Sequence, residues 1–346
     1  MFNRFLGKFS QDIGIDLGTT NTLVYVKDKG IVINEPSVVA VNTRNNQIIS
    51  IGEDAKKMIG KTPGHIMISK PLAGGVISDF EITEKMITHF IKKIHQENFS
   101  LSPRPRVIIG IPLNVTEVER KAVEDAAKSA GAREVYLVEQ PLAAAIGANI
   151  PIGSASGHMV VDMGGGTSEI AVISLGGIVA NTSIRIGGTK FDAAIAEFIR
   201  KKYGLAIGES TSEQIKIQIG SAMYLDDEEK LKMSIRGRDM ISGLPRTIEV
   251  NSDDVTEALQ NELQGIIAAV KSVLFKTPPE LSADVMDKGM VLTGGSSLLR
   301  NMAMLLSQAT GVPAYVADEA LLCVAKGTGI ALDNLESYKR SILFTK

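Results

Sequence analysis

The chain has 346 residues, of which 44% are hydrophobic and 22% are charged, the composition of an ordinary globular protein long enough for two domains. Its formal net charge of −2 argues against a general nucleic-acid binder, which would usually be basic, so we expect no nucleic-acid partner. The single cysteine, Cys323, cannot form an intrachain disulfide, which favours a reducing cytoplasm and a thiol that fills the core.

The chain opens with the pattern of a small amphipathic helix. Its apolar residues fall at helical spacing on one face: Phe2, Phe5, Leu6 and Phe9. Bulky apolar groups flanked by Arg4 and Lys8 are typical of a helix that lies in a membrane interface. We therefore expect these residues to contact a membrane; the alternative is a terminal helix packed on its own domain. No apolar run reaches the ~20 residues of a membrane span, and we expect no signal peptide.

The elements of the first half alternate between strands and helices. Residues 12–41 predict consecutive strands of a meander, and the next predicted elements are a helix at 81–95 and a buried strand at 106–112. A capping box from Thr116 to Glu119 begins the following helix, and Gly131 ends it. A strand at 134–140 then leads into a helix whose first turn carries Pro141.

The loop at 98–107 is a second candidate for membrane contact. It places Phe99 and Leu101 beside Arg104 and Arg106. Exposed apolar tips with basic neighbours suit an anionic membrane surface. The alternative is a loop folded onto its own domain.

The second half repeats the pattern of the first. Residues 158–188 again predict strand, aspartate-glycine turn, strand, turn and strand. The elements that follow are helices at 190–204 and 211–222, peripheral strands and turns at 226–250, a long helix at 253–277, and a strand, double-glycine turn and helix at 288–311. The chain is therefore predicted to contain two mixed α/β halves, each opening on a hairpin with aspartate and glycine at its tip.

The two tips, IDLGTTNT and VDMGGGTS, have the composition of a phosphate-binding cradle. The run Gly164, Gly165 and Gly166 exposes backbone N–H groups without obstructing side chains, so we expect a phosphate to approach it closely. Hydroxyl donors come from Thr19, Thr20 and Thr167. Asp16 and Asp162 end their strands at the same cleft, where a carboxylate would repel phosphate unless a cation lay between them. Mg²⁺ bound through water fits that arrangement.

Four segments resemble the superfamily of actin, hexokinase and heat-shock-chaperone ATPases: IDLGTTNT, EQPLAAAIGA, VVDMGGGTSEIAVISL and LTGGSSLL. Others are similar to the MreB family of bacterial actins within it: GIVINEPSVVA, IGKTPGHI, GVISDFEITEKMI, TPPELSADV and GMVLTGG. The similarity runs from end to end of the chain, which is identified as a member of that family.

The resemblance implies a duplicated actin-like α/β fold, with two domains around a nucleotide cleft and a large and a small subdomain in each. Domain I is expected at 1–148 plus 324–346, with its small subdomain at roughly 34–75. Domain II is expected at 149–323, with its small subdomain at roughly 188–250. The helices near Ala145 and Ala325 would link the two domains.

The resemblance also implies a cofactor, ATP or ADP with Mg²⁺, and assigns the cleft residues. The first phosphate loop is matched by Thr19, Thr20 and Asn21, and the second by Gly164, Gly165 and Gly166. Positions lining the adenosine are matched by Glu213, Lys216, Gly294, Gly295 and Ser296. Asp16 and Asp162 would hold the metal through water. The expected catalytic set is Gln140, Asp16, Asp162 and Thr167.

The family implies partners as well as a cofactor. Its members form ATP-dependent filaments, as antiparallel pairs of protofilaments on the inner membrane. They guide cell-wall synthesis and hold a rod shape. The resemblance thus implies a cytoplasmic protein, peripheral on the inner face of the cell membrane, whose partners are copies of itself and the membrane proteins of cell shape and wall synthesis.

Two departures from the family pattern bear on hydrolysis. The family has a glutamate, taken to act on the attacking water, where this chain has Gln140. Glutamine can orient water but cannot accept a proton as a carboxylate can. Actin itself resembles this chain in having glutamine at the corresponding position. The neighbouring Glu139 would point the other way on a strand. An arginine and an aspartate usual in the family are replaced by Ala73 and Gly74. We therefore expect slower hydrolysis, or hydrolysis weakly coupled to disassembly.

Two other classes share this fold. A sugar or acetate kinase would need a substrate pocket with a catalytic base, usually on large insertions, and the compact chain offers none. A chaperone ATPase would need a separate peptide-binding domain after the last ATPase helix. A filament-forming ATPase is therefore the leading interpretation.

Overall fold

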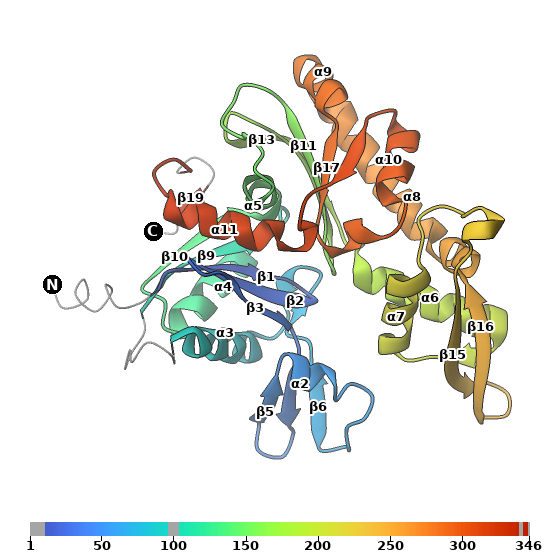
Figure 1. Ribbon diagram of the computed structural model, residues 1–346. Helices are drawn as coiled ribbons and strands as arrows, with labels where there is room; N and C mark the ends of the chain where they lie inside the picture. The colour runs from blue at the N-terminus through green and yellow to red at the C-terminus, as the bar shows by residue number, and fades with distance from the viewer. Residues whose placement is uncertain (1–10, 96–103, 339–341, 345–346) are drawn as a thin grey trace.

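The computed structural model describes residues 11–95, 104–338 and 342–344, which form two large sheets with helices around them (Figure 1). The first sheet has the order β19-β10-β9-β1-β2-β3. Its strands are β1 (Ile13–Leu17), β2 (Asn21–Val26), β3 (Gly30–Pro36), β9 (Arg106–Ile111), β10 (Glu134–Glu139) and β19 (Ile342–Phe344). β1, β2 and β3 pair antiparallel as a meander, whereas β9 and β10 continue the sheet in parallel with β1.

The second sheet repeats this topology. Its order is β13-β12-β11-β17-β18. The strands are β11 (His158–Met163), β12 (Ser168–Ser174), β13 (Gly177–Ile184), β17 (Met290–Thr293) and β18 (Ala314–Val316). Again the first three form an antiparallel meander and the last two run parallel to the first. The predicted duplication is confirmed at the level of strand order and direction.

Helices cover the large sheets and bury one face of each. Those of the first half are α3 (Phe80–His95) and α4 (Glu117–Ser129), and those of the second are α8 (Ser252–Lys276), α9 (Pro279–Lys288) and α10 (Met302–Thr310). The predicted capping box at the start of α4 is present, because the Thr116 hydroxyl accepts from Glu119 N–H while the Glu119 carboxylate accepts from Thr116 N–H. Asn251 and Asp254 form a second capping box at α8.

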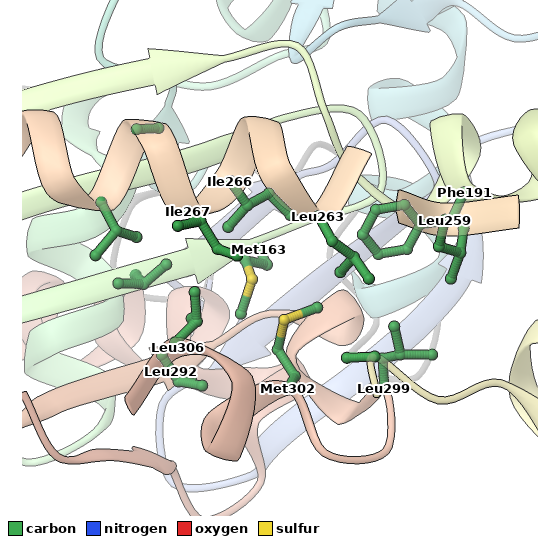
Figure 2. Close-up of a cluster of buried hydrophobic side chains, with 14 of the residues drawn as sticks. Met163, Phe191, Leu259, Leu263, Ile266, Ile267, Leu292, Leu299, Met302 and Leu306 are labelled. Atoms are coloured by element: carbon green, nitrogen blue, oxygen red, sulfur yellow. The ribbon is translucent and has the colours of Figure 1, made fainter. Parts of the chain in front are cut away.

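A continuous apolar core joins α8 to the second sheet. Figure 2 shows Leu263, Ile266 and Ile267 of α8 facing Met163 and side chains of α10 and β17. Fully burying one such side chain contributes roughly 1.5–3 kcal/mol. The cores of both halves therefore give each hairpin tip a rigid base.

Two smaller lobes flank the large sheets in Figure 1. One contains β4 (Val39–Asn42), β5 (Gln47–Ile51), α2 (Glu53–Lys56) and β6 (Ile66–Ser69), followed by the short hairpin of β7 (Leu72–Ala73) and β8 (Val76–Ile77). The other contains α6 (Gly188–Tyr203), β14 (Leu205–Ala206), α7 (Glu209–Ile219), β15 (Lys232–Asp239) and β16 (Pro245–Asn251). The predicted domain and subdomain boundaries stay a prediction.

Two helices, α5 (Gln140–Gly147) and α11 (Cys323–Asp333), pack against each other between the large sheets (Figure 1). Their backbones touch. A Cβ on Gly147 would lie 1.8 Å from the Cys323 carbonyl oxygen, and one on Gly327 would lie 1.7 Å from that of Ala143. Only glycine permits this approach. Cys323 is fully buried in the same contact, where burial raises the pKa of its thiol to about 11, as expected for an unreactive core cysteine.

The Gly147→Ala variant is expected to lose about 1–3 kcal/mol of unfolding free energy, because the new methyl group forces α5 away from α11. Alanine has a higher helix propensity than glycine, so propensity alone would stabilise the variant. A loss of stability would therefore come from the packing of α5 against α11. Urea unfolding measures it. Gly153→Ala is the control, since a Cβ there meets nothing within 4 Å. Equal stability of the two variants would contradict the close contact.

Candidate functional site

A cavity of about 490 Å³ lies where the two hairpin tips meet. Its walls come from both halves of the chain and from both small lobes. Every cleft residue predicted from the sequence lines it: Asp16, Thr19, Thr20, Asn21, Gln140, Asp162, Gly164, Gly165, Gly166, Thr167, Glu213, Lys216, Gly294, Gly295 and Ser296. Residues spread over 280 positions of sequence are thus brought to one place, although their individual roles stay predictions.

The two hairpins present their aspartates in matching positions. Asp16 on β1 pairs across the strands with Leu23, and Asp162 on β11 pairs with Glu169. Each turn is tight: the Gly164 N–H donates to the Thr167 carbonyl at 2.9 Å, and a Cβ on Gly18 would lie 2.5 Å from the Asn21 carbonyl. The equivalent aspartates therefore face the cavity from opposite sides.

The glycines of the second tip are required by the first tip. A Cβ on Gly165 would lie 1.8 Å from the Thr20 hydroxyl, and one on Gly166 would lie 2.4 Å from the Thr19 hydroxyl. Gly164 is less constrained, since its Cβ would meet only the Thr167 carbonyl at 3.4 Å. Phosphate approach was the predicted reason for this run. The structure adds another, which is that the two tips close on each other.

Hydrogen bonds from the first turn of α6 and from Ser296 hold the second tip in place. Gly188 N–H donates to the Gly164 carbonyl at 3.0 Å, and Thr189 N–H donates to the Gly165 carbonyl at 2.8 Å. The Ser296 hydroxyl also donates to the Gly164 carbonyl, at 2.8 Å. These carbonyls are thus engaged away from the cavity, which leaves the tip as a preorganised cradle.

One hydroxyl in the cradle needs a partner. The Thr20 Oγ1 atom is buried, and no other residue in the described part of the chain hydrogen-bonds to it. Buried polar atoms without partners are costly, so a ligand atom is the natural complement. Thr19, by contrast, already accepts a hydrogen bond from Gly75 N–H at 2.9 Å. The orphaned hydroxyl fits a phosphate oxygen.

The two aspartates are buried and electrostatically strained. Burial and the nearby charge of Asp162 together raise the pKa of Asp16 to about 7, against a hydrogen bond from Gln140. Burial likewise raises the pKa of Asp162 to about 7, against a hydrogen bond from Thr293 at 2.8 Å. A divalent cation would favour both charged forms. Among residues 11–95, 104–338 and 342–344 no group of three or more His, Cys, Asp or Glu side chains could hold a metal ion. Two carboxylates that bind through water are a donor set that fits Mg²⁺.

Gln140 is the first residue of α5, although the sequence placed it at the end of the preceding strand. Proline in the first turn of that helix explains the earlier start. The Nε2 atom of Gln140 donates to Asp16 Oδ1 at 3.5 Å. A carboxylate can only accept, so this contact turns the amide nitrogen toward Asp16 and leaves the amide oxygen free to accept elsewhere.

The far end of the cavity is lined by α7 and the turn after β17. Lys216 Nζ lies 2.8 Å from Asp192 Oδ1 and donates to the Gly188 carbonyl at 3.1 Å. Gly294 has a φ of 80°, and a Cβ there would lie 2.4 Å from the Met163 carbonyl. Ile217 and Leu298 line the same end while 68% and 61% exposed, which suits the face of an adenine base.

Several lining residues were not predicted from the sequence: Gly18, Leu23, Lys56, Gly75, Gly188, Phe191, Asp192, Ile217, Gly220, Leu298, Leu299, Arg300, Leu321 and Val324. The pair Gly187-Gly188 at the start of α6 is a sequence signal that could have indicated this part of the cavity, because it is a further glycine turn between a strand and a helix. Lys56 gave no local signal. It comes from the other small lobe and forms a 2.9 Å ion pair with Glu213, and Lys70 pairs with Glu209 beside it.

The departure at Ala73 and Gly74 lies close to the cleft. Gly74 has a φ of 57°, and its missing Cβ would lie 3.6 Å from the side chain of Arg185. The next residue, Gly75, packs so tightly that a Cβ would lie 2.6 Å from Pro112. This segment therefore connects the first hairpin tip, through the hydrogen bond from Gly75 N–H to Thr19, to Arg185 in the second half of the chain.

The predicted membrane residues lie outside the described residues: Phe2, Phe5, Leu6, Phe9, Phe99 and Leu101. The described residues that flank these two segments lie together. Gln11 N–H donates to His95 Nε2 at 3.2 Å, and Asp12 forms a 2.6 Å ion pair with Arg106. In the part of the chain that the structure describes, no helix is long and apolar enough to cross a membrane.

Comparison with known proteins points to one family. The family model described as MreB/Mbl protein matches residues 10–340. The chain is 51% identical over 342 residues to the cell shape-determining protein MreB of Escherichia coli strain K12, covering 98% of each chain. MreB5 of Spiroplasma citri bound to ADP is 37% identical with a TM-score of 0.90, covering 96% of this chain and 98% of that one, and its AMPPNP-bound form has a TM-score of 0.89. The MamK double helical filament, at 19% identity and a TM-score of 0.77 over 94% and 99% of the chains, shares the fold. The predicted duplicated actin-like α/β fold is confirmed.

Proposed function

Because the chain belongs to the MreB/Mbl family, we propose that it is a cell-shape-determining bacterial actin that binds ATP with Mg²⁺ and polymerises into filaments. One observation carries the proposal: every cleft residue predicted from the sequence lines a single cavity between the hairpin tips. The ADP and AMPPNP held by the S. citri relative support a nucleotide as the ligand. The kinase and chaperone alternatives lose their support with the family assignment.

Different residues of the cavity would hold different parts of the nucleotide. Thr19, Thr20 and Asn21 hold phosphates from one side, and Gly164, Gly165 and Gly166 hold them from the other. Glu213, Lys216 and the Gly294–Ser296 turn hold the adenosine. Asp16 and Asp162 hold Mg²⁺ through water, and the ion supplies neutralisation of phosphate charge when bound. The buried acids and the orphaned Thr20 hydroxyl support this assignment.

Hydrolysis in this cavity depends on orienting a water molecule. Gln140 and Thr167 line the cavity between the aspartates, and both can hold water through their oxygens. An amide cannot take the proton of the attacking water, so this chain is expected to hydrolyse ATP slowly. Phosphate-release rates at or above those of relatives with glutamate at this position would refute slow turnover.

The Gln140→Glu variant is expected to release phosphate about 10–100-fold faster, because a positioned carboxylate adds general-base catalysis. Phosphate release at saturating ATP measures the change. The new carboxylate would lie beside Asp16, so its benefit should require Mg²⁺. Gln218→Glu, on the exposed side of α7, is the control for added charge. An unchanged or lower rate would show that position 140 does not limit turnover.

We further propose that filaments form as antiparallel pairs of protofilaments on the inner face of the cell membrane. Phe2, Phe5, Leu6, Phe9, Phe99 and Leu101 would contact the lipid. The hydrogen bond between Gln11 and His95 supports this, because it joins the described ends of both segments. Membrane proteins of cell shape and wall synthesis would be the further partners, in the cytoplasm.

ATP-dependent pelleting, with and without anionic lipid vesicles, tests the proposal when phosphate release is followed in the same tube. Pelleting with ATP but not without it, enhanced by vesicles, with slow phosphate release, is the expected result. Brisk release without polymer would refute the filament function and favour a phosphoryl-transfer enzyme. If vesicles do not change the amount of protein that pellets, the proposed membrane contact is refuted but the filament function is not.

A further inference from the structure

Glu169 is a buried acid to which the proposed function gives no role. Its side chain is completely inaccessible to solvent, on β12 directly after the second phosphate tip. It lies two residues after Thr167 and opposite Asp162 in the hairpin. Residues directly opposite each other on paired strands share a face of the sheet, so Glu169 lies on the same face as Asp162, which lines the cavity.

Three polar groups surround this carboxylate. Leu113 N–H donates to Oε2 at 3.1 Å and the Ser183 hydroxyl donates to Oε1 at 2.7 Å. The Thr167 hydroxyl is the third group, and its interaction with the carboxylate lowers the pKa of Glu169. Burial raises the pKa of Glu169, and these donors oppose the rise. Leu113 belongs to the first half of the chain and Ser183 to the second, so the carboxylate ties the halves together beneath the cavity.

The contact with Glu169 decides the direction of the Thr167 hydroxyl. A carboxylate only accepts, so Thr167 directs its proton toward Glu169. The lone pairs of Thr167 Oγ1 then remain for the cavity, where they can accept. Gln140 likewise keeps an acceptor for the cavity, because its amide nitrogen donates to Asp16 and its amide oxygen stays available.

Two acceptors thus face one cavity, from α5 in the first half and the second tip in the second half. A water molecule has two hydrogens to donate. When both are accepted, its lone pairs point away from the acceptors, which is the orientation a nucleophile needs.

We propose that Glu169 is a positioning residue for the attacking water: it orients Thr167 as an acceptor that works together with Gln140. This rests on the proposed ATP hydrolysis. Glu169 is not among the residues that line the cavity, so its loss should slow turnover without weakening substrate binding.

The Glu169→Gln variant tests the inference in the full-length protein with Mg²⁺ and ATP. An amide has the same shape but one acceptor oxygen and a donating NH₂ group, so it disturbs the direction of the Thr167 hydroxyl. The expected result is a fall in kcat of about 10–100-fold with KM within about twofold. Ser183→Ala is the matched control, since it removes another donor to the same carboxylate and leaves Thr167 in place. Its kcat should stay within about twofold of wild type.

A double variant asks whether Glu169 acts through Thr167. In a Thr167→Val background, Glu169→Gln should reduce kcat no further, because the hydroxyl it orients is gone. Multiplicative losses, or a single Glu169→Gln variant with wild-type kcat, would overturn the inference. Glu169→Asp keeps the buried charge but withdraws it from Thr167, and the same fall in kcat is required of it if the glutamine variant does not fold.

The wild-type protein separates this inference from the proposed function. If wild type binds ATP but releases no phosphate, the proposed hydrolysis fails and the inference fails with it. If wild type releases phosphate and Glu169→Gln matches it in kcat, only the inference is overturned.

Discussion

The Asp162→Asn variant is expected to lose about 10²–10³-fold in ATP hydrolysis, because it removes one of the two carboxylates that would hold Mg²⁺. Asparagine keeps an oxygen for the Thr293 hydroxyl, so the hairpin should retain its shape. Phosphate release at saturating ATP and Mg²⁺ measures the loss. Asp226→Asn, at an exposed turn, is the control for removing one negative charge.

The same variant should stabilise the ligand-free protein, with a defined pH dependence. Burial raises the pKa of Asp162 from 3.8 to about 7, so between these values the native state holds a proton that the unfolded chain has released. The stability contribution of Asp162 is therefore fully present below pH 3.8 and is lost as the pH rises through about 7. Asparagine has no such loss. At pH 8 the variant should be more stable by a few kcal/mol, because one pKa unit corresponds to about 1.4 kcal/mol.

Thermal unfolding of both proteins without nucleotide, at pH 5 and pH 8, measures this difference. The gap in melting temperature should widen toward pH 8. A gap that is constant with pH would show that Asp162 is not held in a costly ionised state. Unchanged hydrolysis would remove it from the metal-binding assignment.

The Gly165→Ala variant is expected to weaken nucleotide binding by about 10–100-fold, because an overpacked methyl group costs about 1–3 kcal/mol and each 1.4 kcal/mol changes the affinity about tenfold. Its methyl group would lie 1.8 Å from the Thr20 hydroxyl, so the two phosphate tips must separate. Titration with a fluorescent ATP analogue measures the affinity. Gly208→Ala is the control, because its φ is −84° and a Cβ there meets nothing within 4 Å.

Gly164→Ala separates the two reasons for the glycine run. Its methyl group would be 3.4 Å from the nearest described atom, the Thr167 carbonyl oxygen. If closure of the tips is the main constraint, this variant should bind nucleotide more tightly than Gly165→Ala. Equal losses would mean that a phosphate, and not the facing tip, requires the glycines.

Local patterns predicted much of the fold. Alternating apolar residues around the two aspartate-glycine turns predicted both meanders, and the Thr116 and Glu119 spacing predicted the start of α4. These signals lie within a few residues of each other, so they need no knowledge of the rest of the chain. The start of α5 was placed one residue late because Pro141 is compatible with either of the first two helical positions.

Residues that act through tertiary contact could not be predicted in this way. Lys56 reaches the cavity only because its lobe folds over toward α7, and nothing near it in sequence shows this. Gly165 and Gly166 line the cavity, as their sequence pattern predicted, but the threonines that face them lie about 145 positions earlier in the chain. Glu169 resembles any polar residue in a strand until its donors from two halves are seen.

The two hairpins match each other, although the nucleotide proposed to bind between them has two different ends. A repeat of strand order and direction makes two equivalent walls, yet a nucleotide has different ends and reacts at one of them. Opposite the aspartate of each wall, the first half carries Leu23 and the second carries Glu169. The copies have thus diverged at equivalent positions: one wall is apolar behind its aspartate and the other polar. Because of that difference the two repeated halves are chemically unequal, so an asymmetric substrate between them can react in only one of its two orientations.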